Sequence, residues 1–144
     1  MLFRSANPTD PTFENRILGE LGDPVDEFRW DVDLGYKEFT VGYRMHYIGP
    51  MYVGAYEDFN GLGGRNPENA DFSDIQKYQE VFYHDLRLEW NLANAGIAKD
   101  FKFYAGVNNL FDTHPPLGLT GIGAGSAIYD FRGRNYYAGF RARF

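Results

Sequence analysis

Five stretches of this chain alternate between apolar and polar residues, and this two-residue period constrains the fold more than any other feature. In the first stretch, Phe28, Trp30 and Val32 stand at every second position and are separated by charged residues. Successive side chains of a β-strand point to opposite faces, so this period predicts strands with one apolar face. The sequence therefore predicts an all-β protein with five strands, at residues 28–36, 39–48, 82–92, 101–108 and 135–144.

The two faces of these strands differ in chemistry. One alternating class is apolar or aromatic, with His84 as its main exception, and the other carries the charge. A soluble β-sandwich also buries one face of each sheet, so the alternation alone leaves that fold open. The charged class contains Arg29, Asp31, Asp33, Arg44, Asp85, Arg87, Glu89, Lys102, Arg141 and Arg143.

Strand length and aromatic placement favour a sheet that spans a membrane. The expected strands approach the ~9–11 residues that cross a bilayer at a tilt, whereas strands of globular sheets usually have ~5–6. Aromatic residues gather near both ends of the apolar faces, as in the girdles of outer-membrane β-barrels. They are Tyr36, Phe39, Trp90, Phe101 and Phe144 toward one end, and Phe28, Tyr47 and Phe82 toward the other.

The connections between the expected strands alternate between short and long. Short links are expected at 35–38 and 94–100, and long ones at 49–79 and 112–129. Outer-membrane barrels have short periplasmic turns and long extracellular loops. We therefore expect residues 25–144 to form five antiparallel strands of a transmembrane β-barrel with a periplasmic C-terminus. Residues 1–24 are expected to form an extracellular loop or a partial strand.

Composition argues against several other classes. No window approaches the ~18 consecutive apolar residues of a membrane helix, and a net charge of −6 argues against a nucleic-acid partner. No signal-peptide core follows Met1, so an exported barrel would need sequence upstream of it. The histidines are dispersed and no catalytic or metal-binding motif is present. We therefore expect no enzyme activity, no cofactor and no metal.

Two segments near the end of the chain carry a family resemblance. Tyr104–Asp112 contains GVNNLFD, and Tyr129–Phe144 contains GRNYYAG and ends in phenylalanine. Together they resemble the C-terminal signature of TonB-dependent outer-membrane receptors. The upstream stretch, from residue 19 through Trp30 to residue 49, is also similar to the preceding strands of that family, so the resemblance covers nearly the whole chain.

The resemblance implies a barrel of about 22 strands closed by an N-terminal plug. It also implies import of a scarce, bulky ligand such as a ferric siderophore, haem, cobalamin or an oligosaccharide, energised through the TonB complex. The implied partners are the lipid bilayer, lipopolysaccharide, the outer-membrane assembly machinery, the rest of the barrel and the plug. Because this sequence lacks a plug, a TonB box and most of the strands, we expect the tail of a longer protein or the product of a truncated gene. Import by this chain alone is not expected.

Three groups of residues are candidates for function. Tyr136, Phe140 and Phe144 resemble the terminal assembly signal, against the simpler interpretation of an ordinary strand end. Candidate lumen-facing residues are Arg44, His46, Asp85, Arg87, Glu89, Arg141 and Arg143, and a cross-strand charge ladder is the favoured interpretation for them. Tyr52, Tyr56 and Arg65 are candidate ligand contacts in the long 49–79 connection, for which a solvated extracellular loop is favoured.

Other functions stay open at this stage. A passive porin-like channel or an outer-membrane enzyme would share the barrel, and a soluble antiparallel β-protein that binds a ligand would share the alternation. The carboxylates of Asp31 and Asp33 lie about 6–7 Å apart on one strand face, but a wetted wall explains them better than glycosidase chemistry. The glycine-rich residues 118–125 lack the lysine of a phosphate-binding loop, so a flexible loop apex is expected.

Overall fold

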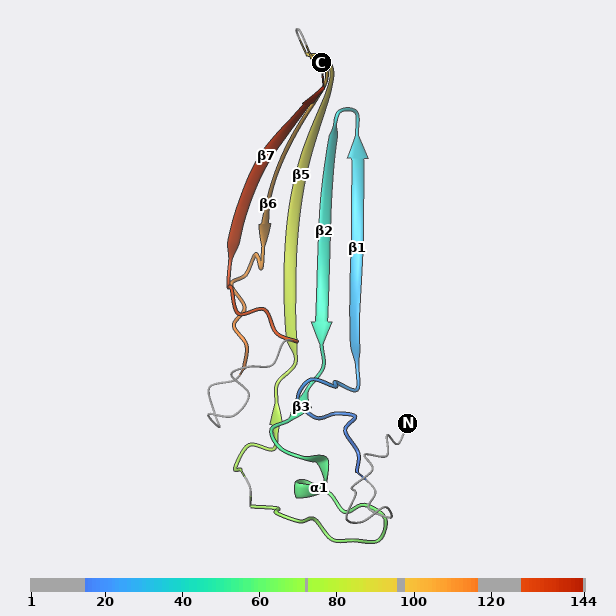
Figure 1. Cartoon of the computed structure of the whole chain (residues 1–144), viewed down its shortest axis with the longest axis vertical. Helices are drawn as coiled ribbons and strands as arrows, with labels where there is room; N and C mark the ends of the chain where they lie inside the picture. The colour runs from blue at the N-terminus through green and yellow to red at the C-terminus, as the bar shows by residue number, and fades with distance from the viewer. Residues whose placement is uncertain (1–14, 72, 96–97, 117–127, 144) are drawn as a thin grey trace. The chain divides into compact units, whose positions relative to one another are not determined.

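The computed structural model describes residues 15–71, 73–95, 98–116 and 128–143. Its secondary structure is almost entirely β, which confirms the all-β part of the predicted fold class, while the five-stranded sheet is not closed within these residues (Figure 1). The chain divides into two compact units. We call them the sheet unit, drawn from Phe28–Tyr47, Phe82–His114 and Phe131–Phe144, and the loop unit, drawn from Met1–Glu27, Ile48–Val81 and Pro115–Asp130. Phe144, residues 118–125 and most of residues 1–24 lie outside the described residues, so the expectations for them stay predictions.

The sheet unit is built on five long strands in the order β1-β2-β5-β6-β7, and neighbouring strands run in opposite directions (Figure 1). The predicted strands are all present, and the link expected at 94–100 is shorter than predicted because both flanking strands continue into it. Lys37 takes a positive φ of 51° in the tight turn between the first two strands. The strands are β1 Glu27–Tyr36, β2 Phe39–Ile48, β5 Val81–Ala95, β6 Ala98–Asn108 and β7 Asn135–Arg143.

The strand register keeps apolar residues opposite apolar residues. Between β5 and β6, Trp90 pairs with Phe103, and between β6 and β7, Phe103 pairs with Phe140. A one-residue slip would turn every such side chain to the other face, so the hydrophobic pattern itself fixes the register. One continuous apolar row therefore crosses the last three strands, as the alternation predicts.

The loop unit has a small core that the two-residue period did not predict. The short strands β3 (Met51–Tyr52) and β4 (Lys77–Tyr78) pair in antiparallel fashion, and the single-turn helix α1 (Tyr56–Phe59) lies between them in sequence. The 49–79 segment was expected to be a solvated loop, and the structure differs because its apolar side chains pack together. Among the described residues of this unit, the buried side chains are those of Ile48, Met51, Val53, Tyr78, Val81, Tyr129 and the carboxylate-bearing Glu57.

Candidate functional site

The charged face of the sheet unit is the candidate functional site, and an arginine that reaches across a strand organises its centre. Arg87 on β5 places Nη2 3.0 Å from Oδ1 of Asp33 on β1, although β2 lies between these strands. Gly42 of β2 lies beneath this contact, and a Cβ there would come 2.5 Å from the Asp33 carboxylate and 3.1 Å from Arg87 Nε. Glycine at position 42 lets the ion pair pass directly over the backbone, and a Cβ there would displace the ends of both side chains.

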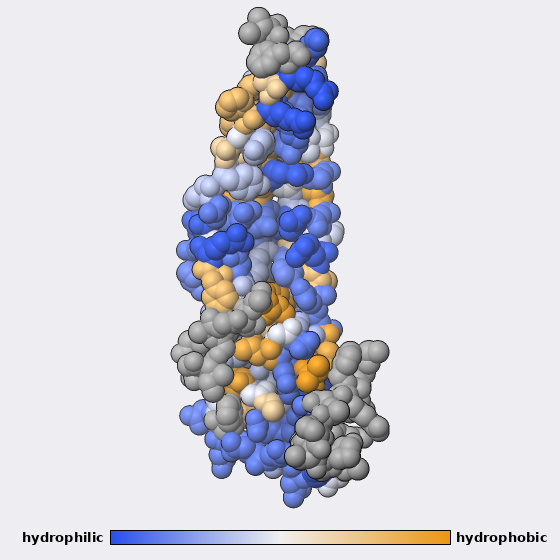
Figure 2. Space-filling model, viewed as in Figure 1, coloured by the Kyte–Doolittle hydropathy of each residue, from blue (hydrophilic) through white to orange (hydrophobic). Residues whose placement is uncertain are grey.

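Further ion pairs extend from this centre across the sheet. Nε of Arg87 lies 3.5 Å from a carboxylate oxygen of Glu89, and the second oxygen of Glu89 lies 2.5 Å from Lys102 Nζ on β6. At the other side, Arg44 Nε lies 2.5 Å from Asp31, joining β2 to β1. Most of these side chains are about half exposed, so each pair adds below ~1 kcal/mol of stability. Together they make a charged band that is exposed in the sheet unit, and Figure 2 shows hydrophilic residues along the strands.

Two tyrosines on the same face place the hydroxyl ends of their rings over glycines of the neighbouring strand. Tyr137 on β7 covers Gly106 on β6, and Tyr104 on β6 covers Gly139 on β7, each ring so close that a Cβ on the glycine would overlap it. The register sets both pairs directly opposite one another. These reciprocal contacts couple β6 to β7, and the sequence pattern gave only a hint of them in the interleaved tyrosines and glycines.

The structure gathers six of the seven candidate lumen-facing residues into two places on the charged face, and His46 lies apart from both. Arg44, Asp85 and Arg87 line a hollow of about 210 Å³ near the middle of the sheet, and Glu89 joins it through Arg87. Arg141 and Arg143 line a second hollow, of about 400 Å³, beside the β5–β6 link. His46 is half-buried, with its ring centroid 6.4 Å from that of Tyr83.

The NNLFD segment forms a hydrogen-bonded junction at the end of β6, in which Asn109 has a structural role. Asn109 is buried with a positive φ of 54°, donates from Nδ2 to the carbonyl of Thr113, and accepts from the Thr113 N–H at 2.8 Å. Its own N–H donates to Asp85 Oδ1 at 2.9 Å. Asparagine tolerates this left-handed conformation better than most residues because its side chain bonds locally.

Asp112 ties the same junction to the start of β7. Its φ is 57°, and its Oδ1 accepts a 2.8 Å hydrogen bond from the backbone N–H of Arg134. Gly133 has a positive φ of 65° and lies close enough to Asp112 that a Cβ would be 3.1 Å from the carboxylate. The two motifs that carry the family resemblance are therefore in direct contact, across the long connection between β6 and β7.

The opposite face of the sheet is apolar and largely exposed in the described residues. Its side chains are stacked in aromatic pairs such as Phe28 with Tyr47 at 4.8 Å and Phe39 with Trp90 at 5.8 Å between centroids. His84, the polar exception, bonds through Nδ1 to the hydroxyl of Tyr43 at 2.7 Å and packs edge-on against Phe111. This hydrogen bond to Tyr43 accounts for a polar residue on the apolar face, so His84 does not indicate a separate site.

The loop candidates have mainly structural contacts. Tyr52 packs against Tyr56, with ring centroids 5.4 Å apart. Each ring also makes a cation–π contact: Lys77 Nζ lies 4.5 Å from the Tyr52 centroid, and the guanidinium carbon of Arg16 lies 4.3 Å from the Tyr56 centroid. Arg65 pairs with Glu68 at 3.0 Å. These contacts stabilise the loop unit. A role of Tyr52, Tyr56 and Arg65 in ligand binding stays a prediction.

Glu20 is the perturbed acid of the loop unit. Burial raises the pKa of its carboxyl above the ordinary value, the hydrogen bond from the Tyr56 N–H at 2.8 Å opposes the shift, and nearby Glu57 adds to it. Among the described residues no three His, Cys, Asp or Glu side chains are placed to hold one metal ion.

Of the candidate assembly residues, Tyr136 and Phe140 lie on the apolar face of β7, each 71 % exposed. Phe144 lies outside the described residues. In the described part of the chain, no helix is long and apolar enough to cross a membrane. Comparisons with models of protein families, with curated proteins and with solved structures found no match for the chain.

Proposed function

We propose that the sheet unit is part of the wall of a transmembrane β-barrel in the bacterial outer membrane. We further propose that this barrel belongs to a TonB-dependent transporter that imports a scarce, bulky ligand. Ferric siderophores, haem, cobalamin and oligosaccharides are the ligand classes that fit the family resemblance.

The exposed apolar face is the observation that carries the proposal. Leu34 is 69 % exposed, Leu88 44 % and Phe140 71 %, and they lie on the same sheet face as a series of stacked aromatic rings. Soluble monomers rarely expose contiguous apolar patches beyond a few hundred Å². Lipid acyl chains would cover this face with no further protein layer, whereas a soluble ligand-binding β-protein would need one.

The dimensions of the strands support the same conclusion. β1 and β2 have ten residues each, β6 has eleven, and β7 has nine, which matches the ~9–11 that span a bilayer at a tilt. The charged ladder lies on the face opposite the apolar one, so a water-filled lumen would hydrate it. Such a lumen is the usual interior of large outer-membrane barrels.

A bilayer also requires that the sheet be completed by other strands. β1 and β7 are the outer strands in the described part of the chain, and each unpaired N–H or C=O in hydrocarbon costs several kcal/mol. We therefore infer that the rest of the barrel pairs with these strands and that a plug meets the charged face. The terminal strand, with Tyr136, Phe140 and Phe144, is the segment that we propose the outer-membrane assembly machinery reads.

The TonB-dependent assignment is supported by the NNLFD and GRNYYAG segments and by the bond between Asp112 and Arg134 that joins them. That contact gives a physical reason for the two motifs to occur together. It does not depend on which ligand is carried.

The experiment has two stages. We expect an epitope-tagged version of the protein, expressed from its complete gene in a Gram-negative host, to fractionate with the outer membrane and to need detergent for extraction. We then expect uptake of the ligand to be lost in a matched host without TonB. Uptake that continues without TonB would indicate a passive channel, and a protein recovered as a monomer in buffer would contradict the barrel itself.

A further inference from the structure

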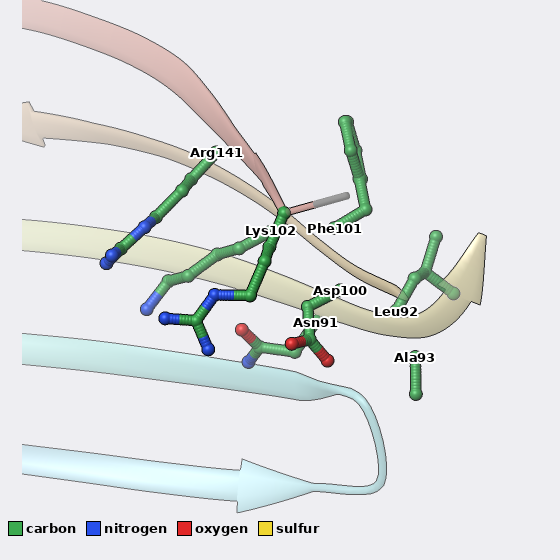
Figure 3. Close-up of a pocket in the computed structure, with 8 residues that line it drawn as sticks. Asn91, Leu92, Ala93, Asp100, Phe101, Lys102 and Arg141 are labelled. Atoms are coloured by element: carbon green, nitrogen blue, oxygen red, sulfur yellow. The ribbon is translucent and has the colours of Figure 1, made fainter. Parts of the chain in front are cut away.

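The second hollow of the charged face differs from the first in its charge balance. It has a volume of about 400 Å³ and is lined by side chains of three neighbouring strands near the β5–β6 link. The lining contains three cations, Lys102, Arg141 and Arg143, and one anion, Asp100. In Figure 3, Lys102 and Arg141 extend to one side of the strands and Phe101 extends to the other.

The two arginines are not neutralised as Arg44, Arg87 and Lys102 are. Lys102 is held by Glu89 at 2.5 Å, and Arg141 stands directly opposite Lys102 in the strand register. Like charges placed opposite each other repel, so this position is unfavourable unless a further anion is present. Within the described residues, neither Arg141 nor Arg143 forms an ion pair, although Arg143 faces Asp100 in the register.

We propose that this hollow binds an oxyanion, a carboxylate or phosphate group carried by a small molecule, through Arg141 and Arg143. The two arginines are two residues apart on one strand face, so their Cα atoms are about 6–7 Å from each other. Each guanidinium presents a fork of N–H donors that matches a carboxylate or phosphate with two parallel bonds. Two such forks hold a group with several oxygens between them.

The surroundings give the hollow selectivity. The chain has a net charge of −6, so general attraction does not bring anions to it, and a local basic region stands out against that background. The side chains of Asn91 and Lys102 add hydrogen-bond donors at the margin. A volume of about 400 Å³ lies within the ~300–1,000 Å³ of small-molecule pockets.

The test is a calorimetric titration of citrate and of inorganic phosphate into the detergent-extracted protein at constant ionic strength. We expect saturable binding that is at least tenfold weaker in Arg141→Gln and in Arg143→Gln. Arg141→Lys keeps the charge but loses the fork, so an intermediate loss is expected. Arg29→Gln is the matched control, since Arg29 lies on the same face of β1 and outside the hollow, and its affinity is expected to match that of the unmodified protein.

Equal affinity in Arg141→Gln and the unmodified protein would overturn the proposal, as would a chloride titration that gives the same heat as citrate. If Arg141→Gln fails to fold, the proposal is tested by Arg143→Gln and Arg141→Lys, and unchanged affinity in both of these variants would overturn it. The same variants are also extracted from membranes, and all of them are expected to need detergent, because removing a charge from the polar face leaves the apolar face unchanged. A failure of the anion-binding proposal is thus distinguished from a failure of the barrel proposal.

Discussion

Replacement of Leu88 tests whether lipid or water covers the apolar face, because the same substitution lowers the free energy of unfolding by different amounts in the two cases. Leu88 is the central residue of β5 and is 44 % exposed. Truncation to alanine removes about three CH₂ equivalents, worth about 2.4 kcal/mol if lipid completes the burial of the side chain. If water covers the exposed part, the same truncation costs about 1.3 kcal/mol.

Leu88→Arg separates the two cases further. An arginine on the lipid side near the middle of the bilayer costs about 2–4 kcal/mol, whereas an exposed position in water tolerates the change within ~0.5 kcal/mol. The measurement is urea unfolding of the protein reconstituted in lipid vesicles, followed by tryptophan fluorescence. The control is Asn135→Arg, an exposed position on the charged face of β7, for which a change within ~0.5 kcal/mol is expected. A cost below ~0.5 kcal/mol for Leu88→Arg would refute lipid contact at this face.

Three further predictions concern the details of the structure. Gly42→Ala displaces the Asp33 and Arg87 side chains and is expected to cost no more than the exposed ion pair that it breaks, below ~1 kcal/mol in urea unfolding, while Gly35→Ala, with open space around its Cβ position, is the control and should keep the ion pair. Asn109→Ala loses both the side-chain bonds and the tolerance for a positive φ, so it should lower stability more than Asn109→Gly, which loses only the bonds; equal losses would contradict the strain argument. Because burial raises the folded-state pKa of Glu20, its protonation favours the folded loop unit: the stabilisation is present below the ordinary pKa and is lost as pH rises through the raised folded pKa. Glu20→Gln should remove that pH dependence, as measured by hydrogen exchange of the loop unit, and an unchanged pH profile would count against it.

Sequence alone predicted the sheet well because its physical cause is local. Side chains alternate on any strand, so Phe28, Trp30 and their equivalents had to share a face. The register itself was not predicted and is seen only in the structure, where it pairs apolar residues with apolar residues. The single-turn helix and short strands of the loop unit were missed because no long periodic segment marks them. Their core depends on contacts between residues far apart in sequence, such as the hydrogen bond from the Tyr52 N–H to the Gly19 carbonyl.

The charged face was predicted as a set of residues but not as a set of contacts. The alternation placed Arg87 and Glu89 on one face, and only the three-dimensional register showed Arg87 reaching Asp33 over Gly42. The excess of positive charge in the second hollow could not be predicted from the sequence either. Lys102 and Arg141 are opposite each other only in the register of β6 and β7, and a long connection separates these two strands in sequence.

The central claim is that the two faces of the sheet contact different solvents, and paired single-cysteine probes test it most directly. The chain has no cysteine, and Val41 and Thr40 are neighbours on β2 whose side chains belong to opposite faces. A fluorophore attached at each position in vesicle-reconstituted protein would be titrated with spin-labelled lipid and with aqueous iodide. We predict that lipid quenches the Val41→Cys probe and iodide the Thr40→Cys probe. Quenching of both probes by iodide alone would contradict the account.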